Sequence, residues 1–130
     1  IACGVALGFD LGENFKASIF QLGLEETMEL AIKMGGDSAS INSPAIIGDM
    51  FLTCSSLTSR NMSFGYELGK GETIEEIRNN RNTIAEGLYT APAIAKLAEN
   101  LQLHTPVINF VAGIVKNGYA KKQDIYQIIK

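Results

Sequence analysis

One stretch of the sequence, "GDMFLTCSSLTSRNMSFG" at residues 48–65, gathers side chains that can bind or move charge. Asp49 is a carboxylate set among apolar residues, and Arg60 is a guanidinium between a serine and an asparagine. A guanidinium beside a hydroxyl and an amide is suited to receive a phosphate group. If a helix starts there, its unpaired N–H groups add positive partial charge. The stretch is therefore a candidate phosphate receptor with a carboxylate nearby.

Both residues also have ordinary structural interpretations. Arg60 could be a surface arginine beside an N-cap, since Ser and Thr commonly precede helices. Asp49 must be exposed, paired or functional, because burying an unpaired carboxylate is costly. Its nearest candidate partner in sequence is Arg60, so a structural ion pair stands beside a catalytic or substrate-orienting role. The residue types and their spacing leave both alternatives open.

Composition narrows the classes of protein. The chain has 130 residues, 46% of them hydrophobic, which fits one compact domain at residues 1–130. Its net charge of −3, with eleven scattered Lys and Arg residues, argues against a nucleic-acid partner. The apolar runs are shorter than the roughly 20 residues that cross a bilayer, so no membrane span is expected. Residues 1–8 show no basic start of a secretory leader.

Two cysteines and one histidine limit the chemistry further. Cys3 and Cys54 form no metal-binding motif, and we expect two reduced, buried thiols in a cytoplasmic protein. His104 has no second histidine to join it, so no metal site is expected, and it is placed at the surface or at a helix end.

The elements that must position these side chains are predicted to be helices. Apolar residues recur at helical spacing from Asn14 to Met34 and predict one long amphipathic helix, ended by Gly35 and Gly36. Its expected apolar stripe consists of Phe20, Leu24, Thr27, Met28, Ala31 and Met34. Its expected solvent face consists of Glu25, Glu26, Glu29 and Lys33.

Helix-start signals mark the rest of the chain. Thr73 and Glu76 form a capping box, and Pro106 after Thr105 is typical of a first helical position. Further helices are predicted from Arg60 to about Leu68, with Thr58 or Ser59 as N-cap, over 91–101 and over 122–129. Because no run alternates with period two, we predict an all-α helical bundle.

Four blocks of the sequence resemble one family, the NAD(P)-dependent glycerol-3-phosphate dehydrogenases. The run at 48–71 resembles the family signature, with Gly-Asp, Thr-Cys, Ser-Arg-Asn, Phe-Gly and Leu-Gly-x-Gly in order. The other similar blocks are "GFDLGENFKASIFQLGLEE" (8–26), "IAEGLYTAPAIAKLA" (84–98) and "TPVINFV" (105–111). Together they cover nearly the whole chain.

The resemblance implies that this is the C-terminal, substrate-binding half of such an enzyme, with the fold of the 6-phosphogluconate dehydrogenase-like C-terminal domains. In that family an N-terminal Rossmann domain holds NAD or NADP, and this chain has no GxGxxG-type loop. The resemblance also implies a general-base lysine upstream of Ile1, a homodimer, and no activity for this half alone.

Residue roles follow from the same resemblance. Asp49 resembles the carboxylate that orients the lysine and the substrate hydroxyl. The positions that resemble the substrate-binding group are Ser59, Arg60 and Asn61. The positions that resemble cofactor contacts are Arg60, Ile84 and Glu86. The implied reaction is hydride transfer between the nicotinamide and carbon 2, which interconverts glycerol 3-phosphate and dihydroxyacetone phosphate for glycerophospholipid synthesis.

The sequence departs from the family pattern at two places, and two other functions stay open. Ile46 stands where the family usually has glycine, which could alter the backbone near Asp49. Residues 21–23 read "QLG" where the family usually has Thr-Arg-Gly. One alternative is a non-catalytic helical module that binds a phosphorylated small molecule. The other is a β-hydroxyacid dehydrogenase, for which Ser-Arg-Asn is not expected.

Overall fold

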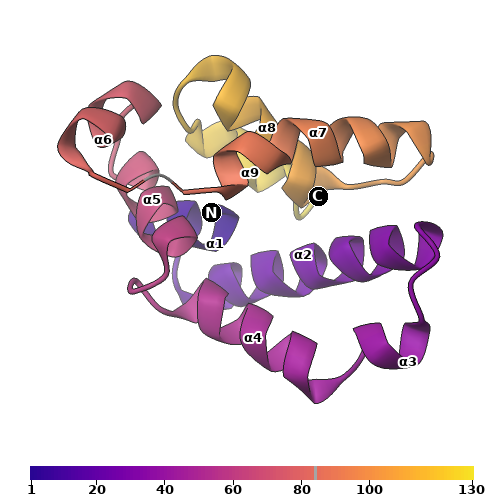
Figure 1. Ribbon diagram of the computed structural model, residues 1–130. Helices are drawn as coiled ribbons and strands as arrows, with labels where there is room; N and C mark the ends of the chain where they lie inside the picture. The colour runs from indigo at the N-terminus through magenta and orange to yellow at the C-terminus, as the bar shows by residue number, and fades with distance from the viewer. Residues whose placement is uncertain (84) are drawn as a thin grey trace.

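The computed structural model describes residues 1–83 and 85–130 and confirms the all-α prediction (Figure 1). Within these ranges no strand is present. The helices are α1 (Ala2–Gly8), α2 (Glu13–Lys33), α3 (Ser38–Ile41), α4 (Pro44–Ser55), α5 (Arg60–Gly69), α6 (Ile74–Asn80), α7 (Gly87–Asn100), α8 (Pro106–Asn117) and α9 (Lys122–Gln127). In the described part of the chain, none of these helices combines the length and apolar character needed to cross a membrane.

The centre of the fold is the contact between α1 and α5, which is close because glycines face each other across it. A Cβ atom on Gly4 would lie 2.1 Å from the carbonyl oxygen of Met62, and one on Gly69 would lie 2.5 Å from that of Val5. Real side chains do not approach backbone this closely, so only glycine fits at these positions. The two backbones therefore touch directly, and α1 lies almost wholly buried.

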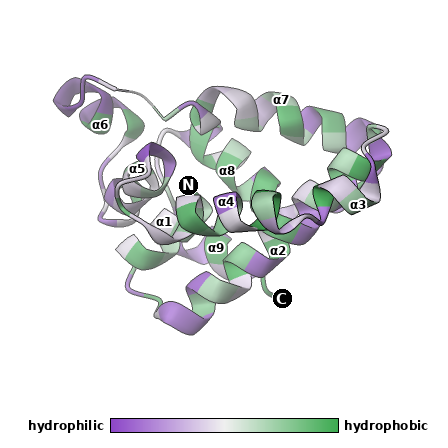
Figure 2. Cartoon of the chain, turned by 60° about the horizontal axis from the view of Figure 1, so that its bottom comes forward, coloured by the Kyte–Doolittle hydropathy of each residue, from purple (hydrophilic) through white to green (hydrophobic). Residues whose placement is uncertain are grey.

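A long arm formed by α2 and α4 extends from this centre, with α3 connecting the two helices at its far end (Figure 1). The aromatic rings of Phe20 in α2 and Phe51 in α4 meet edge to face, with their centroids 5.8 Å apart. None of the residues of α4 is fully buried. Ile46, Phe51 and Leu52 of this helix remain exposed, and Figure 2 shows the hydrophobic colouring along it.

The helices α7 and α8 pack against each other on the opposite side of α2 (Figure 1). The helix predicted over 91–101 begins earlier, at Gly87, so that Pro92 lies inside it. The turn before the proline forms because the N–H groups of Tyr89 and Thr90 both donate to the carbonyl of Glu86. α8 starts at Pro106 with Thr105 at the N-cap position, as predicted.

Other helix ends match their sequence signals. Ser59 is the N-cap of α5, and its hydroxyl accepts a hydrogen bond from the Met62 N–H. Both bonds of the capping box between Thr73 and Glu76 are present at α6. After α2, Gly35 has a φ of 92°, the left-handed conformation that glycine adopts most easily.

The predicted faces of α2 were wrong in part. Glu26 was expected on the solvent face but is only 5% exposed, whereas Met34 was expected on the apolar stripe and is 62% exposed. The buried residues of α2 are Ile19, Leu24, Glu26 and Leu30. Glu26 is buried because its carboxylate accepts hydrogen bonds from the N–H groups of Val107 and Ile108, at 2.7 and 2.9 Å. It therefore takes the capping role that Thr105, whose side chain makes no cap bond, does not fill.

Candidate functional site

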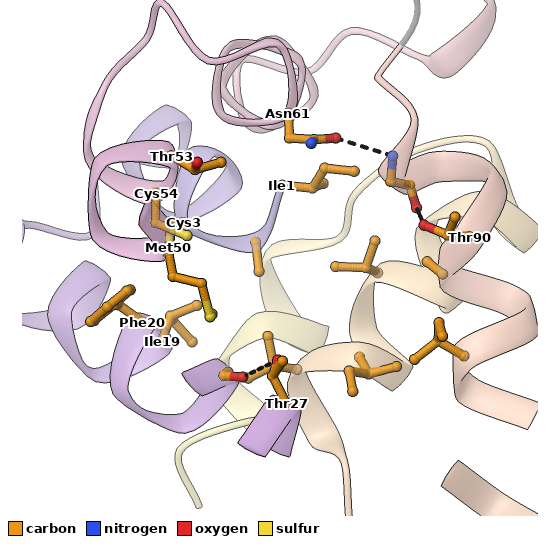
Figure 3. A pocket seen from close by; sticks show the side chains of 18 of the residues that line it. Ile1, Cys3, Ile19, Phe20, Thr27, Met50, Thr53, Cys54, Asn61 and Thr90 are labelled. Carbon is orange, nitrogen blue, oxygen red and sulfur yellow. Dashed lines mark hydrogen bonds between the residues drawn. The ribbon is translucent and has the colours of Figure 1, made fainter. Parts of the chain in front are cut away.

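A cavity of about 410 Å³ lies where α1, α2, α4, α5, α7 and α8 converge (Figure 3). Its walls are mainly apolar, with residues such as Ile19, Met50 and Val107. The polar residues that line it include Asp49, Thr53, Asn61 and Thr90. An apolar cavity with a few convergent polar groups is the usual form of a small-molecule site.

Asp49 comes to this cavity from α4. Thr53 follows one helical turn later and lines the same cavity, because residues four apart lie on one face of a helix. Among the described residues, no ion pair joins Asp49 to Arg60, so the predicted alternative of that ion pair is wrong; Asp49 is exposed. Ile46 lies within the regular helix α4, where a β-branched residue adopts helical angles.

Ser59, Arg60 and Asn61 lie at the start of α5, as the sequence predicted. The Ser59 hydroxyl is used in the cap, 3.4 Å from the Met62 nitrogen. The Arg60 side chain is 61% exposed, and its nearest anionic group is the carboxylate of Glu86 at 3.8 Å. The start of this helix therefore presents a guanidinium that a ligand can reach.

Asn61 is held from the neighbouring segment. Its Oδ1 accepts a hydrogen bond from the backbone N–H of Gly87, with 3.2 Å between oxygen and nitrogen (Figure 3). Gly87 has its own support from Thr90, whose hydroxyl lies 3.4 Å from the Gly87 carbonyl oxygen. The hydrogen bond between Asn61 and Gly87 and the neighbouring ion pair between Arg60 and Glu86 join the start of α5 to the start of α7.

The structure brings only some of the predicted site residues into the cavity. Asp49 and Asn61 line it, whereas Ser59, Arg60 and Glu86 do not. Glu86 is 81% exposed and lies beside Arg60, next to the cavity-lining pair of Asn61 and Gly87. Ile84, the other predicted cofactor contact, lies outside the described residues.

A second ion pair supports the segment that leads to Glu86. The guanidinium of Arg81 bonds the carboxylate of Glu67, with its Nε 3.2 Å from Oε1, and the hydroxyl of Ser63 at 3.0 Å. Both partners belong to α5. The chain that follows α6 is thereby attached to the helix that carries Arg60 and Asn61.

Two thiols lie on the wall of the cavity (Figure 3). Cys3 is buried as predicted, but Cys54 is only half-buried because α4 lies at the surface. The interaction of the two thiols lowers the pKa of Cys54 to about 7, and the same interaction together with burial raises that of Cys3. Neither thiol belongs to a cluster of three or more His, Cys, Asp or Glu residues in the described part of the chain.

Sequence reasoning missed Thr53, Gly87 and Thr90 as cavity residues. The signal for Thr53 was present, since it stands four residues after Asp49 in one helix. Gly87 and Thr90 gave no such signal, because their position depends on how α7 packs against the rest of the bundle.

Comparisons with known proteins agree with this architecture. Residues 1–126 match the family model described as NAD-dependent glycerol-3-phosphate dehydrogenase C-terminus. A glycerol-3-phosphate dehydrogenase [NAD(P)+] from Hyphomonas neptunium is 41% identical over 116 residues, 89% of this chain and 34% of the relative. One from Corynebacterium jeikeium is 36% identical over 130 residues, 99% of this chain and 38% of the relative.

A solved structure gives the same result in three dimensions. The crystal structure of glycerol-3-phosphate dehydrogenase from Coxiella burnetii superposes with a TM-score of 0.91 at 29% identity, and covers 99% of this chain and 40% of that one. The chain thus spans little more than a third of the length of these relatives. Its fold and its match over residues 1–126 show that it belongs to the family of C-terminal domains of NAD-dependent glycerol-3-phosphate dehydrogenases.

Proposed function

We propose that this domain binds the substrate of an enzyme that interconverts sn-glycerol 3-phosphate and dihydroxyacetone phosphate with NAD or NADP. The observation that carries the proposal is the placement of Asp49 and Asn61 on one cavity, with Arg60 at the adjacent helix start. The polar substrate has two ends to recognise, a phosphate and a hydroxyl-bearing carbon. The start of α5 suits the phosphate and Asp49 suits the hydroxyl.

The phosphate would be held by Arg60 and Asn61. A guanidinium offers paired N–H donors to phosphate oxygens, and a helix start adds unpaired N–H groups and positive partial charge. The Ser59 oxygen accepts the cap bond from the Met62 N–H, so its O–H remains able to donate to the phosphate. These groups hold the reacting carbon in place, which is a contribution of position rather than of chemistry.

Asp49 would orient the substrate hydroxyl and the lysine that removes its proton. A carboxylate only accepts hydrogen bonds, so it can hold both the substrate hydroxyl and the N–H groups of the neutral lysine amine that takes the proton. The resemblance assigns that lysine to the sequence before Ile1. The base would move a proton while Asp49 keeps donor and acceptor aligned.

Exposure of Arg60 and Glu86 fits the binding of a large cofactor beside the cavity. Their side chains are 61% and 81% exposed, and both lie at the joined starts of α5 and α7. When bound, the nicotinamide would supply the hydride acceptor or donor. An arginine there could contact a cofactor phosphate, and Glu86 could accept bonds from its hydroxyl groups.

The exposed side of α4 supports a further protein contact. Ile46, Phe51 and Leu52 are apolar and exposed, and apolar surface that a domain leaves uncovered often marks a contact with another protein. We propose that the cofactor domain or a second copy of the chain covers this face. The free thiols of Cys3 and Cys54 support a cytoplasmic location, where reducing conditions keep thiols unpaired.

The decisive experiment is an assay of the protein that carries this domain, with glycerol 3-phosphate and either NAD+ or NADP+. Formation of reduced nicotinamide, its absence with unphosphorylated glycerol, and a large loss of kcat in Asp49→Asn are the expected results. Glu29 is an exposed carboxylate on α2, so Glu29→Gln is the matched control and should change neither kcat nor KM.

Phosphate-dependent binding without any redox turnover would instead support the non-catalytic module. The family match and the names of the relatives favour the glycerol 3-phosphate interpretation over a β-hydroxyacid dehydrogenase.

A further inference from the structure

The bond between Gly87 and Asn61 fixes which end of the Asn61 amide faces the cavity. A backbone N–H can only donate, so the group 3.2 Å from the Gly87 nitrogen must be the amide oxygen. The Nδ2 atom makes no hydrogen bond to any described residue, and Asn61 lines the cavity. Its two N–H donors are therefore available to a ligand there, which is the polarity that a phosphate oxygen requires.

A side chain at position 87 would crowd this arrangement. A Cβ atom on Gly87 would lie 2.8 Å from Asn61 Oδ1 and 3.1 Å from the Cδ1 atom of Ile1. The obstructing atoms are the ends of two flexible side chains, so they can move aside at modest energetic cost. If the Asn61 amide moves aside, however, it loses the N–H that sets its orientation.

Neighbouring contacts also join the segment around position 87 to α5. The Gly87 carbonyl lies 3.4 Å from the Thr90 hydroxyl, and Glu86 contacts Arg60 at 3.8 Å. The Arg81 guanidinium attaches the preceding segment to α5 through Glu67. The start of α7 thus lies beside the start of α5, with the Gly87 N–H 3.2 Å from Asn61 Oδ1.

We propose that Gly87 is a positioning residue for substrate binding. It orients the Asn61 carboxamide so that its N–H donors point at the substrate phosphate, and its missing side chain makes the approach possible. The inference rests on the proposed function, because it takes the occupant of the cavity to be a phosphorylated substrate. It adds that the affinity for phosphate is set from α7, through the orientation that Gly87 gives to the Asn61 amide.

The test is a double-mutant cycle in the full enzyme that carries this domain. Gly87→Ala should raise the KM for glycerol 3-phosphate about 10-fold or more, because a charge-assisted hydrogen bond is lost. The same substitution in an Asn61→Ala background should have no further effect, since Gly87 acts through the amide that is already missing. Gly113 lies in α8 with open space around it, so the control Gly113→Ala should leave KM unchanged.

Equal, additive effects of Gly87→Ala in both backgrounds would overturn the inference, because they indicate a general structural defect. An unchanged KM in Gly87→Ala would overturn it as well. If the wild-type enzyme turns over glycerol 3-phosphate and Asn61→Ala raises its KM, the proposed function stands whatever Gly87 does. A wild-type enzyme without that activity overturns the proposed function, and the inference with it.

Asn61→Asp keeps the inference open to refutation if Gly87→Ala does not fold. Aspartate retains an acceptor for the Gly87 N–H but replaces the cavity-facing donors by a negative charge. We expect its melting temperature to stay near that of the wild type while KM rises about 100-fold, whereas Asn61→Ala should lower both stability and affinity. A melting temperature as low for Asn61→Asp as for Asn61→Ala would show that the amide oxygen is not held as proposed.

Discussion

Glu26, in the middle of α2, accepts a 2.7 Å hydrogen bond from the backbone N–H of Val107, in the first turn of α8. Its second oxygen receives the N–H of Ile108 at 2.9 Å. One carboxylate thus satisfies two of the N–H groups that every helix start leaves unpaired. Because Glu26 is 5% exposed, this contact links two walls of the cavity in a nearly water-free setting.

Replacing Glu26 by alanine should therefore destabilise the domain strongly. Two N–H groups would lose their acceptor, and leaving such donors unsatisfied costs about 1 to 3 kcal/mol each. We expect Glu26→Ala to lower the free energy of unfolding in urea by about 2 to 4 kcal/mol. Glu29→Ala, an exposed glutamate on the same helix, should change it little. Equal effects of the two substitutions would contradict a capping role.

Stability should also depend on pH through this carboxyl. Burial raises the pKa of Glu26 above its ordinary value of 4.5, against the opposing effect of the two N–H groups. A native pKa above the unfolded one means that the folded state binds the proton more tightly, so this stabilisation is full below pH 4.5 and is lost as the pH rises through the native pKa. Unfolding curves from pH 4 to 7 should show the wild type losing stability relative to Glu26→Gln. If the wild type instead gained stability relative to Glu26→Gln as the pH rises, the native pKa of Glu26 would be lowered rather than raised.

The contact of α1 with α5 should tolerate no added methyl group. In Gly69→Ala the new Cβ would lie 2.5 Å from the Val5 carbonyl oxygen, an atom of rigid backbone. We expect a loss of about 3 kcal/mol in the free energy of unfolding, at the upper end of the range for overpacking. Gly113→Ala makes the same change in open space and should stabilise α8 by about 0.5 to 1 kcal/mol. Similar stabilities for both variants would mean that α1 and α5 can separate.

Arg60 should matter for substrate and not for folding. Its side chain is 61% exposed and its one ionic contact, with Glu86, is 3.8 Å long. In the full enzyme, Arg60→Lys should lower kcat/KM for glycerol 3-phosphate nearly as much as Arg60→Ala, by about 10- to 100-fold, because an ammonium lacks the planar fork. Melting temperatures should hardly change, and Lys33→Ala, which removes an exposed positive charge at the end of α2, should leave the kinetics intact. A large fall in melting temperature with preserved kinetics would support a structural role.

Cys54 should react as a thiolate near neutral pH. The hydrogen bond from Cys3 lowers the pKa of Cys54 from 9.0 to about 7, whereas Cys3 itself is held protonated. We expect the rate of alkylation by iodoacetamide to rise with a midpoint near pH 7, with the label found on Cys54 by mass spectrometry. Cys3→Ala should shift that midpoint upward. A midpoint already near 9 in the wild type would contradict the hydrogen bond.

Features that depend on neighbours in sequence could be predicted. A helix start at Thr58 or Ser59 and the capping box of Thr73 and Glu76 were predicted from residue type alone, because a cap bonds an N–H two or three residues away; the structure has Ser59 as the cap of α5. The burial of Glu26 could not be predicted in this way, since its partner stands 81 residues further along the chain. Helical periodicity alone predicted that Glu26, as a polar residue, lies on the solvent face of α2.

The same difference between local and long-range features applies to the candidate site. Asp49 and the Ser-Arg-Asn group came from a local signature, but their placement relative to one cavity depends on how α4, α5 and α7 pack. The approach of Gly87 to Asn61 across 26 residues left no pattern in the sequence. A single glycine has many possible reasons, and only the packed structure shows which one applies.

The glycine contact of α1 with α5 has a consequence for how the domain folds. The two helices lie at opposite ends of the segment that contains α2, α3 and α4, so they can meet only after that whole segment has closed into a loop. The pair of α7 and α8 closes across a short connection and carries a far smaller entropic cost. The α7–α8 hairpin can thus form early, whereas the start of α5, with Arg60 and Asn61, acquires its final position only when the slow, non-local closure is complete.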